Sequence, residues 1–472
     1  MRSCLYRFSA AIALTFAGPL LAQSVVSYQT TSDLKHALEA QAPIVFTSAN
    51  SPAQADALSI SVDETRRFQT IDGFGASITD GAAWLLEDRL KPASRDTVMA
   101  HLFDSKNGIG LSFLRQPIGA SDLSRDHASF DDMPAGQQDP ELKHFSVAHD
   151  DNYIFPVIRQ ALKLNPAITV MASPWSPPAW MKTGDTMYGG QLREDAMPMY
   201  ATYLTRSVEA FAAEGVPVKY LTIQNEPLYQ PNDYPGTLIP ATQASRLVGQ
   251  FLGPDLRRAG LKTTVLAYDH NWDHPEYPLT VLSDPQAMPF VAGSALHCYG
   301  GDVSAQKAIH DKFPDKGIWL TECSGGTWDK EPALVKTARL LIESTRDWSK
   351  AVVLWGLVLD ENHNPHAGGC DTCRGLVTVD LKQSPASVSY TGDYYGLGHA
   401  SKFVHPGATR IDSTSFGNTS LQTVAFQNPD GSVVLLVLNN ETDAKEFHVH
   451  WHGREFRTTL DSDALATYVW HS

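Results

Sequence analysis

Residues 220–226, Tyr220-Leu-Thr-Ile-Gln-Asn-Glu226, form a short run of apolar and β-branched residues that ends in polar ones. A run of this kind predicts a β-strand. Similar runs alternate with longer amphipathic stretches from about Phe68 to Trp355. This alternation is typical of repeated βα units and therefore of a parallel sheet.

Eight such runs occur, which is the number of strands that closes a (β/α)₈ TIM barrel. Helices are expected between them, including 195–214 and 331–348, where apolar residues recur at three- and four-residue spacing in the second stretch. A last helix is expected over about 390–403. The eight runs begin at Phe68, Ile109, Ile168, Tyr220, Thr263, Ser294, Ile318 and Ala351.

The pattern changes after Pro406, where shorter alternating runs are separated by turn residues. One turn, Asn428-Pro-Asp-Gly431, is a hairpin signal. We expect a small antiparallel β-sandwich side domain here, completed by an N-terminal segment such as Leu58–Val62. The alternating runs cover 421–426, 433–438, 446–451 and 466–470.

The N-terminus has the features of an export signal. Arg2 and Arg7 precede an apolar stretch from Phe8 to Leu21, and the small residue Ala22 follows. This order is typical of a secretory signal peptide, and the stretch is shorter than the ~20 apolar residues of a membrane span. We therefore expect a secreted or periplasmic protein with no integral membrane span after cleavage. The expected division is 1–22 for the signal peptide, 23–67 for the N-terminal part of the side domain, 68–403 for the barrel and 404–472 for the side domain.

The composition excludes some partners. The chain has 43% hydrophobic and 19% charged residues, which is ordinary for a soluble globular protein. Its formal net charge of −15 argues against nucleic acid and anionic membrane surfaces as partners, because both attract basic proteins. A neutral sugar is compatible with this charge.

Polar and aromatic residues gather at the expected carboxyl ends of the strands, where (β/α)₈ barrels hold their reacting groups. Two of them are glutamates, Glu226 and Glu322. Retaining cleavage of a glycoside needs two carboxyl groups roughly 5–5.5 Å apart, one to attack the anomeric carbon and one to protonate the leaving oxygen. We predict Glu226 as the general acid and base and Glu322 as the nucleophile. The other members of the set are Arg115, Asp122, Trp175, Asn225, His297, Tyr299 and Trp355.

The neighbours of the glutamates suggest how the two carboxyl groups differ. Two carboxylates this close do not both stay ionised cheaply, so we expect the pKa of Glu226 to be raised and that of Glu322 to be held down. Arg115 is the natural group to keep Glu322 charged, and Tyr299 is placed to donate a hydrogen bond to it. Asn225 is expected to bind the sugar 2-hydroxyl.

Aromatic and acidic residues are expected to bind the sugar. Trp175 lies in a proline-rich loop and Trp355 ends the last strand, so either indole face suits stacking on a sugar ring. Asp122 can accept two hydrogen bonds from sugar hydroxyls. Candidates for outer subsites follow the strands in loops and are Tyr229, Tyr234, Trp272 and Trp328.

Cys370 and Cys373 form a C-x-x-C pair with His363 and His366 just upstream. These four residues have the composition of a zinc site. In an oxidising compartment the favoured interpretation is instead a local disulfide that closes a loop.

Cys298 and Cys323 fall inside expected strands. Side chains alternate along a strand, so His297 and Tyr299 share one face while Cys298 points the other way. If Glu322 points into the barrel mouth, Cys323 points outward. We expect both cysteines to be buried free thiols.

Six segments resemble glycoside hydrolase family 30, and within it the glucosylceramidase-like branch. The resemblance implies a barrel with a side β module, retention of configuration, the two glutamates in the roles above, and no metal or organic cofactor. It also supports Asp122, Trp175, Asn225, His297, Tyr299 and Trp355 as contacts to the glycone. The segments are Asp72-Gly-Phe-Gly-Ala-Ser-Ile-Thr-Asp, Arg115-Gln-Pro-Ile-Gly-Ala-Ser-Asp, Ala172-Ser-Pro-Trp-Ser-Pro-Pro-Ala-Trp, Gln224-Asn-Glu-Pro, His297-Cys-Tyr and Thr321-Glu-Cys.

The cysteine-bearing loop after Leu359 departs from the animal glucosylceramidases and looks more like microbial members, which include β-1,6-glucanases. The leading hypothesis is a hydrolase of terminal β-D-glucosides, related to glucosylceramidase and so to sphingolipid metabolism. The alternative is an endo- or exo-acting β-1,6-glucanase with the same two glutamates. A carbohydrate-binding protein without catalysis is the hypothesis from another class. The expected partner is thus a β-glucoside, a glucan or a glycolipid.

Overall fold

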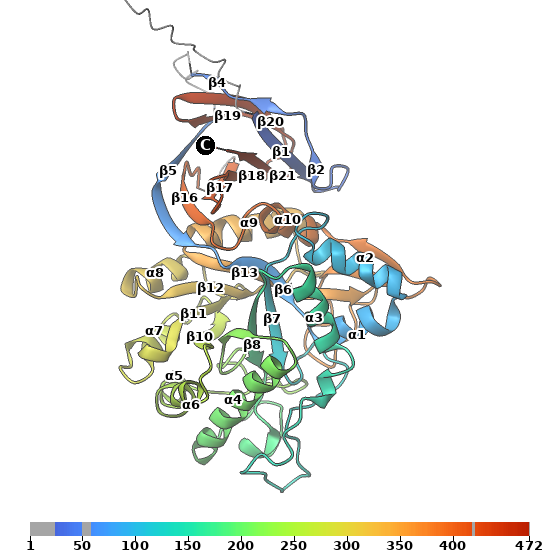
Figure 1. The fold of residues 1–472 in the computed structure, drawn as a ribbon, viewed down its shortest axis with the longest axis vertical. Helices are drawn as coiled ribbons and strands as arrows, with labels where there is room; N and C mark the ends of the chain where they lie inside the picture. Colours follow the sequence, from blue (N-terminus) through green and yellow to red (C-terminus); the bar gives the residue numbers. More distant parts are fainter. Residues whose placement is uncertain (1–23, 50–57, 418–420, 472) are drawn as a thin grey trace, which may run out of the picture.

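The computed structural model describes residues 24–49, 58–417 and 421–471. It has two parts: a barrel surrounded by helices, and a β-sandwich seated against one side of the barrel (Figure 1). The expected signal peptide lies outside the described residues. Among the helices of the described ranges, none combines the length and apolar character needed to cross a membrane.

Eight parallel strands, β6 to β13, form the barrel. Each pairs with its neighbours in chain order, and the barrel closes where β13 pairs with both β6 and β12. The expectation of a (β/α)₈ barrel is therefore confirmed. The strands are β6 Gly73–Ser77, β7 Phe113–Ile118, β8 Thr169–Pro174, β9 Val218–Leu221, β10 Thr264–Asn271, β11 Val291–His297, β12 Gly317–Glu322 and β13 Ser349–Asp360.

A separate cluster of buried side chains fills the barrel interior. Strand side chains alternate, so Phe113 joins this cluster while its neighbour Leu114 packs with the helices outside. Close approach of strands is also required at Gly75, where a Cβ atom would overlap the carbonyl oxygen of Phe113. The interior cluster comprises Phe113, Met171, Tyr220, Leu266, Ala295, Trp319, Ala351 and Val353.

Helices surround the barrel, and the three regions expected to be helical contain α4, α9 and α10. The buried side of α9 includes Leu334, Ala338, Leu341 and Ile342, which are the residues of the apolar repeat. The α-helices are α1 Asp80–Trp84, α2 Pro92–Phe103, α3 Ile154–Leu164, α4 Met197–Ala213, α5 Ala241–Arg246, α6 Gly253–Arg258, α7 Glu276–Ser283, α8 Ser304–Lys312, α9 Ala333–Arg346 and α10 Gly392–Ser401.

The side domain is a sandwich built from both ends of the chain. The expected hairpin at Asn428-Pro-Asp-Gly431 joins β17 to β18, which pair antiparallel over their whole length. The N-terminal strand β1 pairs with the last strand β21. The strands of this part are β1 Ser24–Thr31, β2 Glu39–Ala40, β3 Ile44–Val45, β4 Thr47–Ser48, β5 Leu58–Thr70, β16 Thr409–Ser413, β17 Leu421–Gln427, β18 Val433–Asn439, β19 Lys445–Trp451, β20 Arg454–Leu460 and β21 Ala464–Trp470.

One predicted barrel strand begins in a different place. Phe68 lies in β5, which pairs with β16 of the sandwich as far as Thr70, and the barrel begins only at Gly73. β5 thus leads the chain from the sandwich into the barrel, as its course in Figure 1 shows. The sequence pattern could not separate the two strands because only two residues lie between the end of β5 at Thr70 and the start of β6 at Gly73.

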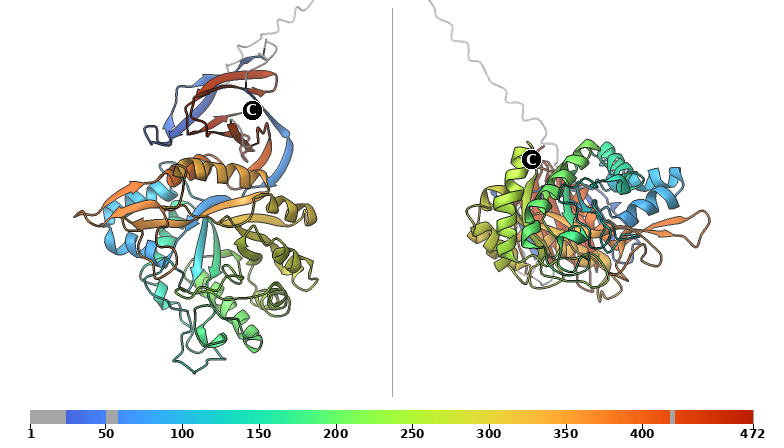
Figure 2. Two further views of the ribbon diagram at one scale, coloured as in Figure 1. Left: turned by 180° about the vertical axis from the view of Figure 1, so that it is seen from behind. Right: turned by 90° about the horizontal axis from the view of Figure 1, so that it is seen from below.

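The barrel has one added hairpin. β14, Gly375–Asp380, pairs parallel to the end of β13, and β15, Ser387–Tyr390, pairs antiparallel to β14. The hairpin projects from the side of the barrel in both orientations of Figure 2. The loop between β13 and β14 carries the C-x-x-C pair and returns to the barrel mouth.

The two parts are held together by buried polar contacts as well as apolar ones. On α9, Arg346 donates to the backbone oxygen and to Oγ of Ser413 at 3.0 and 2.9 Å. On α10, the ring nitrogens of His399 lie 2.8 Å from the hydroxyls of Thr30 and Thr467.

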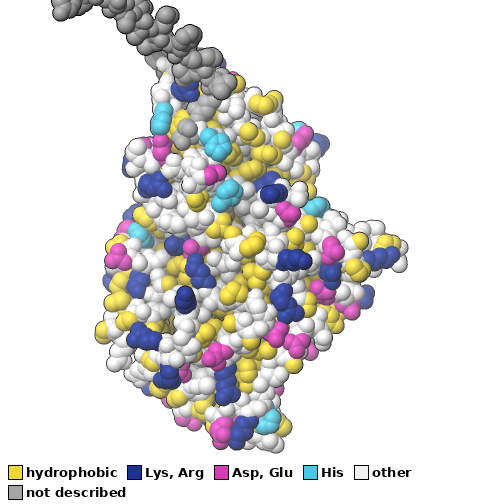
Figure 3. Space-filling model, in the orientation of Figure 1, with side chains coloured by type: hydrophobic (Ala, Val, Ile, Leu, Met, Phe, Trp, Pro, Cys, Tyr) yellow, Lys and Arg dark blue, Asp and Glu magenta, His cyan; other side chains and the backbone are white. Residues whose placement is uncertain are grey.

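On the face in Figure 3, acidic and basic side chains are interspersed, with no large region of one sign.

Candidate active site

A cavity of about 580 Å³ opens at the carboxyl ends of the barrel strands. Nine of the residues predicted for the site line it, and two, Arg115 and His297, do not. The predicted residues that line the cavity are Asp122, Trp175, Asn225, Glu226, Tyr299, Glu322, Trp355, Cys370 and Cys373.

Glu226 and Glu322 face each other across this cavity. Carboxylate oxygens of the two residues lie within 4.8 Å of each other. Retaining glycosidases hold their carboxyl groups about 5–5.5 Å apart, whereas inverting enzymes need about 6.5–9.5 Å to admit a water molecule. The separation therefore suits attack by one carboxylate and proton transfer by the other.

Arg115 lies beneath the cavity and is fully buried. It donates from Nη1 to Glu322 Oε2 at 2.5 Å, and from Nη2 to Asn225 Oδ1 at 2.7 Å and Asp269 Oδ2 at 2.9 Å. Tyr299 donates its hydroxyl to the other oxygen of Glu322 at 2.9 Å. Two donors, one of them charged, thus hold Glu322 in place and favour its ionised form.

Asp269 was not predicted, yet most of the buried hydrogen bonds of the site converge on it. Besides Arg115, its oxygens accept from the hydroxyls of Ser173, Thr222 and Thr321 at 2.6 to 2.9 Å. Despite complete burial, the charge of Arg115, the hydrogen bond and charge of His297 and the hydrogen bond of Thr321 hold the pKa of Asp269 well below its usual range. Its place at the end of the fifth strand run was the available sequence signal.

The backbone at two of these acidic residues is in the left-handed region. Glu226 has φ 48° and Asp269 has φ 66°. Residues without glycine's freedom adopt this region at some cost, and such positions often occur at functional sites. Here the amide of Glu226 donates to the carbonyl of Asp269 at 2.9 Å, which ties the segment after β9 to β10. The turn directs the Glu226 side chain into the cavity.

His297 lies behind the two glutamates. Its Nε2 is 3.0 Å from Asp269 Oδ1, and its Nδ1 is 3.2 Å from Glu226 Oε1 and 3.9 Å from Glu322 Oε1. The side chain is fully buried and does not line the cavity, so the structure places it against the carboxylates. Although burial opposes protonation, the surrounding carboxylates raise the pKa of His297 to about 9.

The charge of His297 changes the expected order of the two carboxyl groups. Burial raises the pKa of Glu322, opposed by His297 and Arg115. The pKa of Glu226 is lowered, because the hydrogen bond and charge of His297 together outweigh the burial of Glu226. The expectation of a raised pKa on Glu226 and a lowered one on Glu322 is therefore wrong for the free site. The physical reason for this reversed order is the charged ring of His297, which donates its hydrogen bond to Glu226.

Two tryptophans form one wall of the cavity. The Trp175 and Trp355 rings are stacked with centroids 4.8 Å apart, and the Arg115 guanidinium lies 4.7 Å from the Trp175 ring. Trp355 Nε1 donates to Asp122 Oδ2 at 3.3 Å. Burial, together with the charge of Glu322, raises the pKa of Asp122 to about 7. Because both indoles are buried and stacked on each other, this wall offers a sugar ring apolar contact and the hydrogen bonds of Asp122.

Exposed aromatic side chains stand at the opening. Tyr229 and Trp328 line the cavity and are 50% and 48% exposed, and Tyr234 also lines it. We call Tyr229, Tyr234 and Trp328 the aromatic rim. Trp272, the fourth candidate for an outer subsite, is instead buried in the main hydrophobic core.

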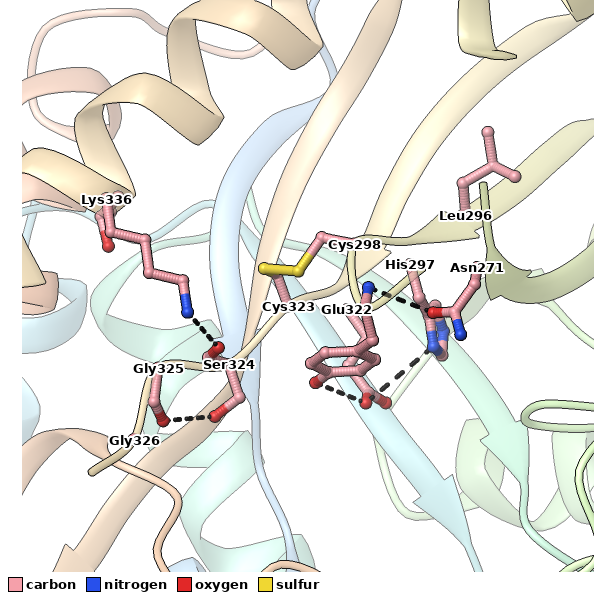
Figure 4. Close-up of a disulfide and its surroundings, with 12 residues drawn as sticks. Asn271, Leu296, His297, Cys298, Glu322, Cys323, Ser324, Gly325, Gly326 and Lys336 are labelled. Carbon is pink, nitrogen blue, oxygen red and sulfur yellow. Dashed lines mark hydrogen bonds and ion pairs between the residues drawn. A yellow bond between two sulfur atoms is a disulfide. The ribbon is translucent and has the colours of Figure 1, made fainter. Parts of the chain in front are cut away.

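All four described cysteines are in disulfides. Cys370 and Cys373 are joined in the cavity wall, so neither sulfur is available as a zinc ligand, and His363 Nδ1 is bound to the Cys373 carbonyl oxygen at 2.8 Å. Cys298 and Cys323 are also joined, beside Glu322 (Figure 4). The prediction of free thiols at these two positions is wrong, because the outward-facing side chains of two adjacent strands meet each other.

Two groups of described side chains have metal-ligand composition. Glu226, His297 and Glu322 form one, and both ring nitrogens of His297 already lie within hydrogen-bond distance of carboxylate oxygens, 3.0 Å from Asp269 and 3.2 Å from Glu226. The other group, His448, His450 and Glu455, lies on β19 and β20 of the sandwich. The cavity itself therefore suits acid–base chemistry by side chains.

Comparison with known proteins agrees with this architecture. A family model described as the glycosyl hydrolase family 30 TIM-barrel domain matches residues 71–404, and one described as the glycosyl hydrolase family 30 beta sandwich domain matches residues 407–468.

Among curated relatives, an endo-1,6-beta-D-glucanase of Neurospora crassa is 32% identical over 92% of this chain and 93% of its own length. A lysosomal acid glucosylceramidase of Mus musculus is 28% identical over 88% of this chain and 83% of its own. A solved endo-beta1,6-glucanase structure superposes with a TM-score of 0.87 at 31% identity, covering 95% of this chain and 100% of that one. The structure of SrfJ from Salmonella typhimurium superposes with a TM-score of 0.88 at 26% identity over the same shares.

Proposed function

The chain belongs to glycosyl hydrolase family 30, and we propose that it is an endo-acting β-1,6-glucanase with Glu322 as nucleophile and Glu226 as general acid and base. Retaining hydrolysis of glycosides is the activity of this family. The assignment of residues and the choice of glucan are the parts that we add.

In the first step a Glu322 oxygen bonds to the anomeric carbon while the bond to the leaving oxygen breaks, and Glu226 gives that oxygen its proton. In the second step Glu226 takes a proton from water as the water oxygen attacks the same carbon and Glu322 leaves. Two inversions at one carbon give net retention.

The surrounding charges suit the ionised nucleophile and the second of these steps. Arg115 and Tyr299 stabilise the ionised nucleophile, because each donates a hydrogen bond to one of its two oxygens. When Glu322 becomes an ester its charge disappears, which lowers the pKa of Glu226 further. Glu226 can then act as a base in the second step, with the charged His297 beside it.

The glycone would bind between the tryptophan wall and the glutamates. Asn225 uses its oxygen to accept from Arg115, so its amide nitrogen remains for the sugar 2-hydroxyl. Asp122 is placed to accept hydrogen bonds from other hydroxyls of the same ring, and Trp175 lines the cavity beside it.

The choice of a glucan chain rests on one observation, the aromatic rim. Tyr229 follows Glu226 and Trp328 follows Glu322, so both extend from the loops that carry the reacting groups. Asn232, Asp233 and Asn271 line the cavity beside them. Exposed rings among hydrogen-bonding side chains suit the ring faces and hydroxyls of further sugars better than they suit acyl chains. Relatives of 30% identity or more that carry the name endo-1,6-beta-D-glucanase support the same choice.

Hydrolysis of terminal β-D-glucosides, including glucosylceramide, is the second candidate. It was the leading hypothesis from the sequence, and relatives named glucosylceramidase at 28% identity support it. The polar rim favours it less. Export of the protein is likewise our proposal, and rests on the order of charged and apolar residues at the N-terminus.

The test compares purified protein with the variants Glu322→Gln and Glu209→Gln, the second of which changes an exposed glutamate on α4. Substrates are β-1,6-glucan, an aryl β-glucoside and glucosylceramide in detergent, with products separated by chromatography. We expect oligosaccharides of several lengths early in glucan digestion, normal rates in Glu209→Gln and none in Glu322→Gln. Release of glucose alone would contradict endo action, and cleavage of glucosylceramide but not of glucan would favour the second candidate.

A further inference from the structure

The pairing between the nucleophile's strand, β12, and its neighbour β11 ends at the nucleophile itself. β11 and β12 pair in parallel from Gly293 with Gly317 up to His297 with Glu322. The register shifts between Leu296 and His297, so the last pair is already irregular. Tyr299, which donates to Glu322, lies two residues beyond the end of β11. Backbone pairing between these two strands therefore does not reach Tyr299.

A covalent link begins where the pairing ends. Cys298 lies between His297 and Tyr299, Cys323 follows Glu322, and the two sulfurs form a disulfide with Cα atoms 5.3 Å apart. Figure 4 shows this disulfide joining the two segments beside His297 and Glu322. Cys323 is buried, and Cys298 is half-buried. Cys298 is thus adjacent to two side chains that contact a reacting carboxylate, and Cys323 is adjacent to Glu322 itself.

Few other contacts fix Tyr299. The residue as a whole is 44% exposed, its amide donates to Asn271 Oδ1 at 3.1 Å, and its ring lies edge-on to His297 with centroids 6.1 Å apart. Its hydroxyl reaches Glu322 Oε1 at 2.9 Å. Glu322, by contrast, is held from the other side by the buried Arg115. The position of the tyrosine relative to the nucleophile therefore depends strongly on the segment that Cys298 anchors.

We propose that the Cys298–Cys323 disulfide is a positioning element for catalysis, which fixes the Tyr299 hydroxyl against the Glu322 carboxylate. The inference rests on the proposed role of Glu322 as nucleophile. A hydrogen bond donated to a carboxylate favours its ionised form, so a displaced tyrosine leaves fewer nucleophiles in the charged state. A misplacement of this kind reduces the rate of the chemical step more than it reduces binding.

A purely structural disulfide makes a different prediction. Closing a loop stabilises the folded chain by restricting the unfolded one, which would lower the melting temperature on removal and leave kcat per folded molecule unchanged. The positioning role predicts a loss of kcat that depends on the Tyr299 hydroxyl. Removal of the hydroxyl itself gives the means to separate the two roles.

The experiment is a double-mutant cycle with Cys298→Ala/Cys323→Ala as one change and Tyr299→Phe as the other, assayed on an aryl β-glycoside that the wild type cleaves. We expect each change alone to lower kcat roughly 10- to 100-fold with KM altered less than about threefold, and the combination to be little worse than either. The acidic limb of the kcat/KM profile should move to higher pH in both, because both remove a donor from Glu322.

The matched control is Cys370→Ala/Cys373→Ala, which removes the other disulfide from the wall of the same cavity. We expect it to change KM more than kcat and to combine additively with Tyr299→Phe. If the Cys298→Ala/Cys323→Ala effects are also additive, or only the melting temperature falls, the positioning role is excluded. Should the double alanine variant not fold, Cys298→Ser alone, which breaks the disulfide and keeps the buried Cys323, enters the same cycle. Glu322→Gln is run in parallel: activity in that variant would overturn the proposed nucleophile, whereas its inactivity beside an additive cycle overturns the disulfide proposal alone.

Discussion

The floor and the rim of the cavity are built in opposite ways. The floor consists of Arg115, Asp269, His297 and Glu322, which are buried and joined by charged hydrogen bonds of 2.5 to 3.0 Å. The aromatic rim is exposed or half-exposed, and two of its rings, Tyr229 and Tyr234, contact each other with centroids 6.4 Å apart. The difference separates two properties, since the floor determines which bond chemistry is possible and the rim determines which polymer presents that bond.

The largest effect is expected at the junction of the two regions, in Glu226→Gln. An amide cannot protonate the leaving oxygen, so kcat on β-1,6-glucan should fall about 10³-fold or more. On an aryl β-glucoside whose leaving group needs no proton, the first step should fall less than about tenfold. Rates on both substrates check this. Equal losses would contradict the assignment of Glu226 as the acid.

A floor residue that never touches substrate should come next. Asp269→Asn removes the negative charge paired with the fully buried Arg115. Breaking a buried ion pair on one side costs on the order of 3–5 kcal/mol, so the melting temperature should fall. We also expect kcat to fall about 100-fold on every substrate alike, because Arg115 orients Glu322. If the loss of kcat differs between substrates, Asp269 does not act through the floor alone and the proposed separation of floor and rim is contradicted.

The rim should show the reverse pattern. In Trp328→Ala we expect KM for β-1,6-glucan to rise about tenfold, while kinetics on an aryl β-glucoside change less than about twofold, since one stacking contact is worth roughly 0.5–1.5 kcal/mol. The control is Tyr188→Ala, another exposed aromatic residue (41%), which does not line the cavity. Equal effects on the two substrates would mean that Trp328 contacts the glycone instead of the chain.

The smallest effect is a displacement of the pH profile. His297 is charged at neutral pH, and its charge lowers the pKa of Glu226. Without that charge, in His297→Gln, the pKa of Glu226 rises, so the protonated acid persists to higher pH. The basic limb of kcat/KM should then move upward by at least about one pH unit. The control is His310→Gln, a histidine stacked on Trp348. If the basic limb of the kcat/KM profile does not move, His297 does not lower the pKa of Glu226.

Much of the floor could be predicted from sequence because the barrel orders its strand ends. Once eight strand runs are recognised, Glu226, Glu322 and Asn225 must lie around one opening, and Arg115 must lie in the strand beneath it. Asp269 escaped prediction because a lone aspartate at a strand end has many structural explanations. Its importance depends on partners from four other strands, which no local pattern reports.

The remaining differences share a physical cause, which is contact between segments distant in sequence. Alternation correctly turned Cys298 and Cys323 away from the cavity, but could not show that they face each other across β11 and β12. The order of the pKa values of Glu226 and Glu322 also depends on a distant segment, because it is set by which of the two glutamates lies nearer His297. The rim is the least predictable part, because loop conformations are not set by strand periodicity.

The most direct test of the account is to trap the covalent intermediate. The protein would be incubated with an activated 2-deoxy-2-fluoro β-glucoside, which slows hydrolysis of the glycosyl–enzyme more than its formation, then digested and analysed by mass spectrometry. We predict one sugar per chain, attached to the peptide that contains Glu322, and no label in Glu322→Gln. A sugar attached to Glu226 or to any other carboxylate would contradict the proposed division of roles between the two glutamates.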